Sequence, residues 1–214
     1  MAGGVTTLSV REFSDGLAAK QPTPGGGSAA ALAGALGAGL VSMVCRYTVG
    51  RERFAEVEEA MQRLLARSEE LRTELERAVE DDVLAYGGYS DAQSMPRDTD
   101  EQRRARDEAL QRALRASTDV PLAVAERCAE LLELAVEAAE LGNPYLISDA
   151  AVGAELAAAA LAGAELNVRM NLGGVEDEQF VQAAGARLEA VAALAAGREL
   201  VERTTRIVRE RAPS

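Results

Sequence analysis

The stretch PTPGGGSAAALAGALGAGLVSMVC, residues 22–45, contains no charged residue and decides the fold. Its first three glycines, Gly25, Gly26 and Gly27, precede Ser28. We predict that Ser28 caps the helix that follows, because serine oxygens accept hydrogen bonds from the first N–H groups of helices. That helix, about 28–49, is mostly alanine and glycine, so we expect it to be buried with neighbours close to its backbone. The loop before it is either an ordinary turn or a cradle for an anion or carbonyl group.

A second alanine-rich stretch, residues 150–164, predicts another slender helix that starts near Ser148. We expect the two slender helices to cross at the centre of a compact all-α helical bundle, wrapped by helices that carry one apolar stripe each. Those outer helices are expected over about 52–90 with a break at Gly87-Gly88 as an alternative, 99–141 with a bend at Pro121, and about 175–210. A short first helix is expected over 9–19, with Ser9 and Glu12 as a capping box. No segment alternates apolar and polar residues as a strand does, and we expect 1–214 to form one domain.

The composition excludes several classes of function. A formal net charge of −12 argues against nonspecific nucleic-acid binding and against docking on anionic membranes. Residues 28–45 approach the length of a membrane span, but alanine and glycine dominate and we find no second span, so no membrane partner is expected. Cys45 and Cys128 lie in apolar helical surroundings, which predicts reduced thiols and a cytoplasmic protein.

The sequence contains no histidine, which is the usual general acid–base and the commonest metal ligand. Because the two cysteines are also isolated, we expect no metal site. Any proton transfer must therefore use Asp, Glu, Tyr, Lys, Arg, the backbone or water.

Acidic residues cluster at Glu80-Asp81-Asp82, beside apolar positions of the same predicted helix. Asp82 and Tyr86 are four residues apart and share a face with the core-like Val79. This placement would leave Asp82 half-buried, where desolvation suits a carboxyl group to proton transfer. The alternative is a solvated acidic face, which is where most acidic side chains lie.

Other polar residues have a structural and a functional interpretation. Lys20, the only lysine, is either a solvated cation or the charge that completes the glycine cradle. Asn143 follows a predicted helix end, and Ser148 or Asp149 is predicted to cap the next helix. Asn167 and Asn171 are four residues apart, so they either bridge helices or face a polar ligand.

Taken in order, a series of short motifs resembles the formiminotetrahydrofolate cyclodeaminase and methenyltetrahydrofolate cyclohydrolase family over about residues 8–210. These motifs are Phe13, Pro24-Gly-Gly-Gly-Ser28, Gly34-Ala-Leu-Gly37, Met43-Val-Cys45, Gly50-Arg-x-Arg-Phe54, Asp82-x-x-Ala-Tyr86, Met95-Pro96, Val120-Pro-Leu122, Gly142-Asn143, Ser148-Asp149, Asn167-Val-x-x-Asn-Leu172 and Asp177-Glu-x-Phe180. The resemblance implies an all-α homodimer with a folate site in a groove that involves the glycine loop.

The resemblance also implies an enzyme. Such enzymes close 5-formiminotetrahydrofolate to 5,10-methenyltetrahydrofolate with release of ammonia, or interconvert the methenyl compound and 10-formyltetrahydrofolate with water. The tetrahydrofolate derivative is the substrate, and no metal or redox cofactor is required. The residues do not distinguish the two reactions, because ammonia leaves in one reaction and water attacks in the other at the same carbon.

On this resemblance, Asp82 is expected to transfer the proton, with Glu80 as the second candidate. Asp149 suits the side-by-side N–H and amino groups of the pterin ring. Lys20, Arg51 and the N–H groups of the loop suit the anionic glutamate tail. The remaining expected substrate contacts are Pro24, Gly25, Gly26, Gly27, Ser28, Tyr86, Asn143 and Asn167.

Two other functions remain open from the sequence. One is a relative of these enzymes that performs ring-closing or C–N chemistry on a different small molecule. The other is a non-catalytic helical interaction protein, since slender helices alone can serve dimer packing.

Overall fold

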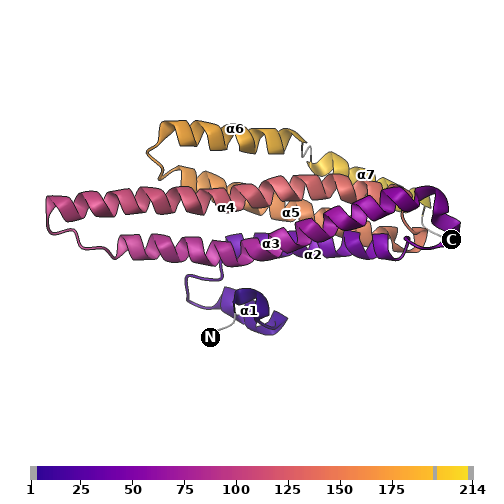
Figure 1. The fold of residues 1–214 in the computed structure, drawn as a ribbon, viewed down its shortest axis with the longest axis horizontal. Coiled ribbons are helices and arrows are strands. Elements are labelled where there is room, and N and C mark those ends of the chain that lie inside the picture. The colour runs from indigo at the N-terminus through magenta and orange to yellow at the C-terminus, as the bar shows by residue number, and fades with distance from the viewer. Residues whose placement is uncertain (1–3, 195–196, 212–214) are drawn as a thin grey trace.

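The structure, a computed structural model, describes residues 4–194 and 197–211, and every regular element in these ranges is helical (Figure 1). The α-helices are α1 (Val10–Ala18), α2 (Gly26–Arg46), α3 (Glu58–Gln93), α4 (Asp100–Leu141), α5 (Ile147–Leu172), α6 (Glu178–Leu194) and α7 (Gly197–Arg211). Short 3-10 turns are η1 (Val5–Thr7), η2 (Glu52–Val57) and η3 (Pro144–Leu146). The expected all-α class is confirmed.

The two slender helices cross closely, as expected. A Cβ atom added to Gly37 of α2 would lie 2.8 Å from the carbonyl oxygen of Gly153 in α5. Farther along the pair, Gly26 lies opposite Asn167 and Gly163 lies opposite Ala30, so α2 and α5 run antiparallel. The long helices α3 and α4 pack against this pair through fully buried leucines, which are Leu71, Leu75, Leu122, Leu131 and Leu132.

Several predicted helix boundaries are confirmed by their caps. Ser9 accepts a hydrogen bond from the backbone N–H of Glu12, and the Glu12 side chain accepts one from the Ser9 N–H, which is a capping box. Thr99 and Gln102 form the same arrangement at the start of α4. α4 continues through the buried Pro121 to Leu141.

Several boundaries differ from the prediction. α2 spans Gly26–Arg46 instead of about 28–49, and α3 begins at Glu58, after η2, instead of near residue 52. α3 does not break at Gly87-Gly88, because both glycines lie inside a regular helix with open space around them. The segment expected as one helix over 175–210 contains two, α6 and α7, on either side of residues 195–196. Its alanine-rich sequence gives no stop signal there except Gly197, glycine being a poor helix former.

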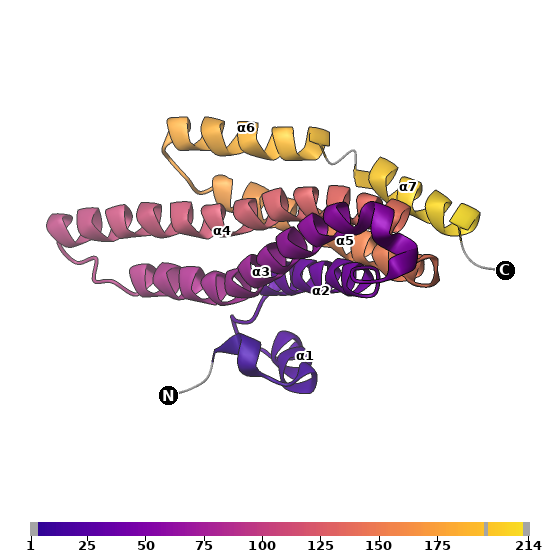
Figure 2. The same cartoon turned by 45° about the vertical axis from the view of Figure 1, so that its right-hand side comes forward.

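The slender helices are wrapped only in part, and both α2 and α5 keep exposed apolar side chains. On α5, Val152, Leu166 and Met170 are 52%, 70% and 80% exposed, and on α2 Leu36 is 56% exposed. α3 and α4 lie on one side of the pair and α1 lies to one side of the bundle, so the pair is not enclosed (Figures 1 and 2). Leu36 borders a cavity with Val10 and Phe13 of α1, and Met170 borders a second cavity between α3, α4 and α5.

By length and composition alone, Gly26–Arg46 and Pro144–Leu172 are both apolar enough to cross a membrane. The expectation that no second such stretch exists is therefore wrong, since the alanines of α5 raise its hydropathy. In the most apolar part of each stretch, 61% of the residues are buried inside the protein for Gly26–Arg46 and 39% for Pro144–Leu172.

The cysteines are free and buried in the core. Burial raises the pKa of Cys45 and that of Cys128 to about 12, so both remain protonated thiols at neutral pH.

Candidate active site

The glycine loop forms the N-terminus of α2. Pro24, which follows a cis peptide bond, is buried, and Gly25 is the extended residue at which the helix begins. The first intrahelical bond runs from the Ala29 N–H to the Gly25 carbonyl, at 3.0 Å. The prediction that Ser28 caps the helix is therefore wrong, because the helix starts earlier and Ser28 lies within its first turn.

Ser28 is fully buried, and its hydroxyl donates a hydrogen bond to Oδ2 of Asp82 in α3 at 2.6 Å instead of capping α2. The other carboxylate oxygen, Oδ1, lies 2.1 Å from the position that a Cβ atom on Gly27 would occupy. The loop and Asp82, which were singled out separately in the sequence, are thus in direct contact. Asp82 is half-buried, as its helical position predicted.

Asp82 also lines a cavity of about 360 Å³ between α3, α4 and α5. Tyr86 lines it one turn further along α3, and Asn167 lines it from α5, so these two expected site residues join Asp82. The full lining comprises Asp82, Ala85, Tyr86, Tyr89, Leu114, Ser117, Pro121, Asn167, Met170, Asn171 and Gly174. No lysine or arginine is among these lining residues.

The two asparagines differ in their partners. Nδ2 of Asn171 donates to the Ser117 carbonyl at 2.7 Å and so ties α5 to α4, which is the bridging role that the sequence left open. Nδ2 of Asn167 donates to the carbonyl of Gly163 in its own helix at 2.8 Å. The Asn167 side chain therefore makes no bond between helices in the described structure and can present its amide oxygen to a ligand.

Tyr89 and Ser117 line the cavity but are absent from the residues predicted for the site. Tyr89 is seven residues after Asp82 and three after Tyr86, so the same helical face that linked Asp82 and Tyr86 also includes it. The rings of the two tyrosines lie 6.4 Å apart and are tilted by 52°. Ser117 comes from another helix, and no pattern in the sequence indicated it.

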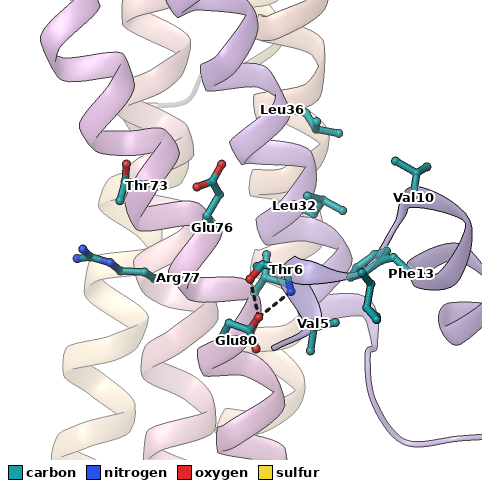
Figure 3. Close-up of a pocket in the computed structure, with 12 residues that line it drawn as sticks. Val5, Thr6, Val10, Phe13, Leu32, Leu36, Thr73, Glu76, Arg77 and Glu80 are labelled. Carbon is teal, nitrogen blue, oxygen red and sulfur yellow. Dashed lines mark hydrogen bonds between the residues drawn. The ribbon is translucent and has the colours of Figure 1, made fainter. Parts of the chain in front are cut away.

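Glu80 lies in a different place from Asp82. It accepts hydrogen bonds from the backbone N–H of Thr6 at 2.6 Å and from the Thr6 hydroxyl at 2.7 Å (Figure 3). Burial opposes ionisation of Glu80, but the bonds from Thr6 outweigh it and hold the pKa of this carboxyl below its ordinary value. Glu80 therefore anchors the N-terminal segment beside a separate apolar cavity of about 620 Å³ that contains Leu32 and Phe13.

Three other expected site residues lie at the far end of α2 and α5. Arg51 follows α2, and Asn143 and Asp149 flank the start of α5. α2 has 21 residues, so this end is about 30 Å from Ser28 along the helix axis. The structure does not bring these residues to Asp82 within one chain.

The polar residues at this far end have structural partners of their own. The Asn143 N–H donates to the Thr48 hydroxyl at 3.0 Å, and its side chain accepts from the Tyr145 N–H. Asn143, and neither Ser148 nor Asp149, thus provides the side-chain cap, and it caps the 3-10 turn before α5. Lys20 is exposed in the segment between α1 and α2.

Comparison with known proteins supports a common origin over most of the chain. The family described as formiminotransferase-cyclodeaminase matches residues 9–190. A methenyltetrahydrofolate cyclohydrolase from Methylorubrum extorquens is 46% identical over 182 residues, which are 85% of this chain and 86% of that protein. The formimidoyltransferase-cyclodeaminase of Rattus norvegicus is 37% identical over 172 residues, but the match spans only 32% of that longer protein.

A solved structure has the same fold. The crystal structure of formiminotetrahydrofolate cyclodeaminase from Thermotoga maritima superposes with a TM-score of 0.84 and 29% identity. The match covers 96% of this chain and 98% of that one. On the family match and the coverage of the Methylorubrum relative, this chain belongs to the formiminotransferase-cyclodeaminase family.

Proposed function

We propose that this chain is an enzyme that opens or closes the one-carbon bridge between N5 and N10 of a tetrahydrofolate. The observation that carries the proposal is the Asp82 carboxylate, held by Ser28 and lining a cavity of about 360 Å³. Both reactions pass through a tetrahedral carbon between the two nitrogens, and both need one group that moves a proton on and off. A carboxylate at that carbon also stabilises the positive charge of the methenyl group.

In the hydrolytic direction, Asp82 accepts a proton from the water that attacks the methenyl carbon. The hydroxyl group on this carbon then loses its proton to solvent as the bond to N5 breaks, and N5 takes up the proton that Asp82 accepted. The formyl group stays on N10, and one proton is released overall. We place this reaction first because the 46% identical relative, which this chain nearly matches in length, is named a cyclohydrolase.

In the cyclising direction, N10 attacks the formimino carbon of 5-formiminotetrahydrofolate. A proton passed through Asp82 to the outer nitrogen lets it leave as ammonia, and the methenyl bridge remains. The names of the rat relative and of the Thermotoga structure support this second reaction. Neither reaction changes the oxidation state of the one-carbon unit, and a carboxylate can carry the protons, so we propose that no metal or redox cofactor takes part.

Side chains around Asp82 suit the rest of a folate. Tyr86 and Tyr89 offer ring faces to aromatic groups, and Asn167 offers a hydrogen-bonding amide. Because the cavity lining has no cation, the glutamate tail is expected to leave the cavity towards cations outside it, of which Lys20 is a candidate.

The deciding experiment is a spectrophotometric assay of the purified protein with each substrate. Loss of the methenyl absorbance from 5,10-methenyltetrahydrofolate would support hydrolysis, and its appearance from 5-formiminotetrahydrofolate would support cyclisation. Thermal shift with folate analogues tests binding separately, since a ligand that binds only the folded state raises Tm. Turnover of neither substrate together with no thermal shift would contradict the proposal and favour a non-folate relative or an interaction protein.

We also propose that the chain forms a homodimer through the exposed stripe of α5. This stripe presents Val152, Leu166 and Met170, with the exposed alanines Ala159 and Ala162 between them. A two-fold axis near these alanines would pair Val152 of one copy with Met170 of the other, because such an interface uses the same patch twice. The far end of the partner's α5, which carries Asp149, would then approach the Asp82 cavity.

A lipid surface is the competing occupant of this stripe, given the hydropathy of α2 and α5. The net charge of −12 disfavours an anionic bilayer, and small alanines suit close contact between helices. We therefore propose a protein without membrane partners. The buried free thiols are consistent with a cytoplasmic location, which we also propose.

A further inference from the structure

We propose that Gly27 and Ser28 are positioning residues that hold the Asp82 carboxylate, and that the Ser28 side chain does not contact the substrate. This inference rests on the proposed role of Asp82 in proton transfer. It reassigns the glycine loop, which the sequence suggested as a cradle for the anionic tail of the substrate. In the structure the anion beside the loop is the protein's own side chain.

Burial excludes Ser28 from direct contact with a ligand in this conformation. The residue has 0% exposure, and its hydroxyl donates to Asp82 Oδ2 at 2.6 Å. Ser28 is absent from the residues that line the cavity, whereas Asp82 is present. A short hydrogen bond to a carboxylate is stronger than one between neutral groups, so it can fix the rotation of the Asp82 side chain.

The position of the Asp82 carboxylate also depends on the absence of a side chain at Gly27. Oδ1 of Asp82 lies 2.1 Å, and Cγ 2.7 Å, from the position of a Cβ atom there. Any residue other than glycine would therefore push the carboxylate away from α2. Ser28 fixes one oxygen and Gly27 leaves room for the other, so the two residues together define one position of the carboxylate.

This position is also electrostatically favourable. The first backbone N–H groups of a helix lack intrahelical acceptors and carry partial positive charge, which favours a nearby anion. Asp82 contacts the first turn of α2, which is 21 residues long. A carboxylate held here before substrate arrives needs no reorganisation during proton transfer, which is how a positioned group lowers the barrier.

The test compares Ser28→Ala with Ser28→Thr and with a matched control, Ser42→Ala. Ser42 is buried in the same helix and bonds to the Ser68 hydroxyl at 2.8 Å, away from Asp82. Removing the Ser28 hydroxyl should lower kcat about tenfold to a hundredfold with KM changed less than about threefold, which is the size of one hydrogen bond to a charged group. Ser28→Thr should recover most of kcat, and Ser42→Ala should leave it unchanged.

Gly27→Ala should lower kcat further, because the added methyl group displaces the carboxylate. Gly87→Ala is the matched control, because Gly87 is also helical and has open space around it, and this variant should keep full activity. A crystal structure of Ser28→Ala gives a readout independent of turnover, and we expect the Asp82 carboxylate to adopt a second rotamer.

The outcomes separate this inference from the proposed function. If the wild-type protein turns over neither folate, the proposed function fails, and the crystal structure alone then decides the positioning role. If the wild type is active and Ser28→Ala keeps its kcat with Asp82 in place, the inference is overturned. A fall in kcat that Ser28→Thr does not reverse, with Tm lowered as in Ser42→Ala, would also overturn it, because that pattern reflects structure alone.

Discussion

Gly37 and Gly153 face each other at the crossing of α2 and α5. A Cβ atom on Gly37 would lie 2.8 Å from the Gly153 carbonyl oxygen, and one on Gly153 would lie 3.0 Å from the Gly37 carbonyl oxygen. Each glycine therefore makes room for the backbone of the other helix. Because α2 and α5 run antiparallel through this crossing, the N-terminus of α2 lies beside Asn167.

Substituting Gly153→Val should destabilise the protein by at least about 1–3 kcal/mol, because the side chain meets backbone that cannot rotate away. Urea unfolding followed by circular dichroism would measure this loss. Gly39→Ala is the control in α2, since its Cβ would meet only the Arg72 side chain at 3.8 Å. A Gly153→Val protein as stable as the control would contradict the close crossing.

Asp82→Asn should lower kcat by about two to four orders of magnitude if Asp82 transfers the proton. The amide can still accept the Ser28 hydrogen bond, so folding should be preserved. Asp81→Asn, in the exposed neighbouring residue, is the control and should retain activity. A loss of less than threefold in Asp82→Asn, measured by the methenyl absorbance assay, would remove Asp82 from this role.

Patterns of local sequence were enough to predict much of the fold. Alanine and glycine at 150–164 predicted a slender helix, and α1 begins at a capping box of Ser9 and Glu12, because both features depend on contacts within a few residues. The face shared by Asp82 and Tyr86 was predictable for the same reason.

Contacts between distant segments could not be predicted in this way. Nothing local in the sequence indicates that Glu80 meets Thr6, or that Ser28 bonds to Asp82 instead of capping its own helix. Asn143 and Asp149 also looked equivalent to Asn167 in sequence, but the antiparallel course of α5 places them at the opposite end of the bundle.

The Glu80–Thr6 contact should make the attachment of the N-terminal segment depend on pH. The folded-state pKa of Glu80 lies below its ordinary value of about 4.3, so its stabilising contribution is fully present above that pH. It is lost as the pH falls through the lower, folded-state value. The protection of the η1 amides, measured as exchange relative to the intrinsic rate at each pH, should therefore fall below about pH 4 in the wild type.

Glu80→Gln should show faster exchange of η1 already at neutral pH, with less dependence on acid. Thr6→Val removes the hydroxyl partner and should have a smaller effect, because the Thr6 backbone N–H can still donate. The effects of the two substitutions should not add, since the residues share one contact. Additive effects would mean that Glu80 and Thr6 act separately.

The uninterrupted course of α3 predicts that Gly87→Ala and Gly88→Ala each stabilise the protein, by up to about 1 kcal/mol. Alanine favours the helix over glycine, and an added Cβ meets no other atom within 4 Å at either position. Thermal unfolding should show the increase in Tm. A decrease in Tm would contradict a regular helix at these two glycines and favour the break considered from the sequence.

The exposed stripe of α5 gives a direct test of the proposed dimer. Leu166→Glu should convert the dimer to a monomer, because a charge buried without a partner at an interface costs several kcal/mol. Leu84→Glu is the matched control, since both leucines are 70% exposed but Leu84 lies on α3. Light scattering coupled to size exclusion would report the mass of each variant in detergent-free buffer.

Activity of the Leu166→Glu monomer then tests whether the partner completes the site. Asp149 and Arg51 lie about one helix length from Asp82 within a chain, so they can reach its substrate only from a second copy. A monomer that keeps its fold and loses turnover would support a shared site. Full activity in the monomer would show that Asp82, Tyr86 and Asn167 suffice and would exclude the partner's residues from catalysis.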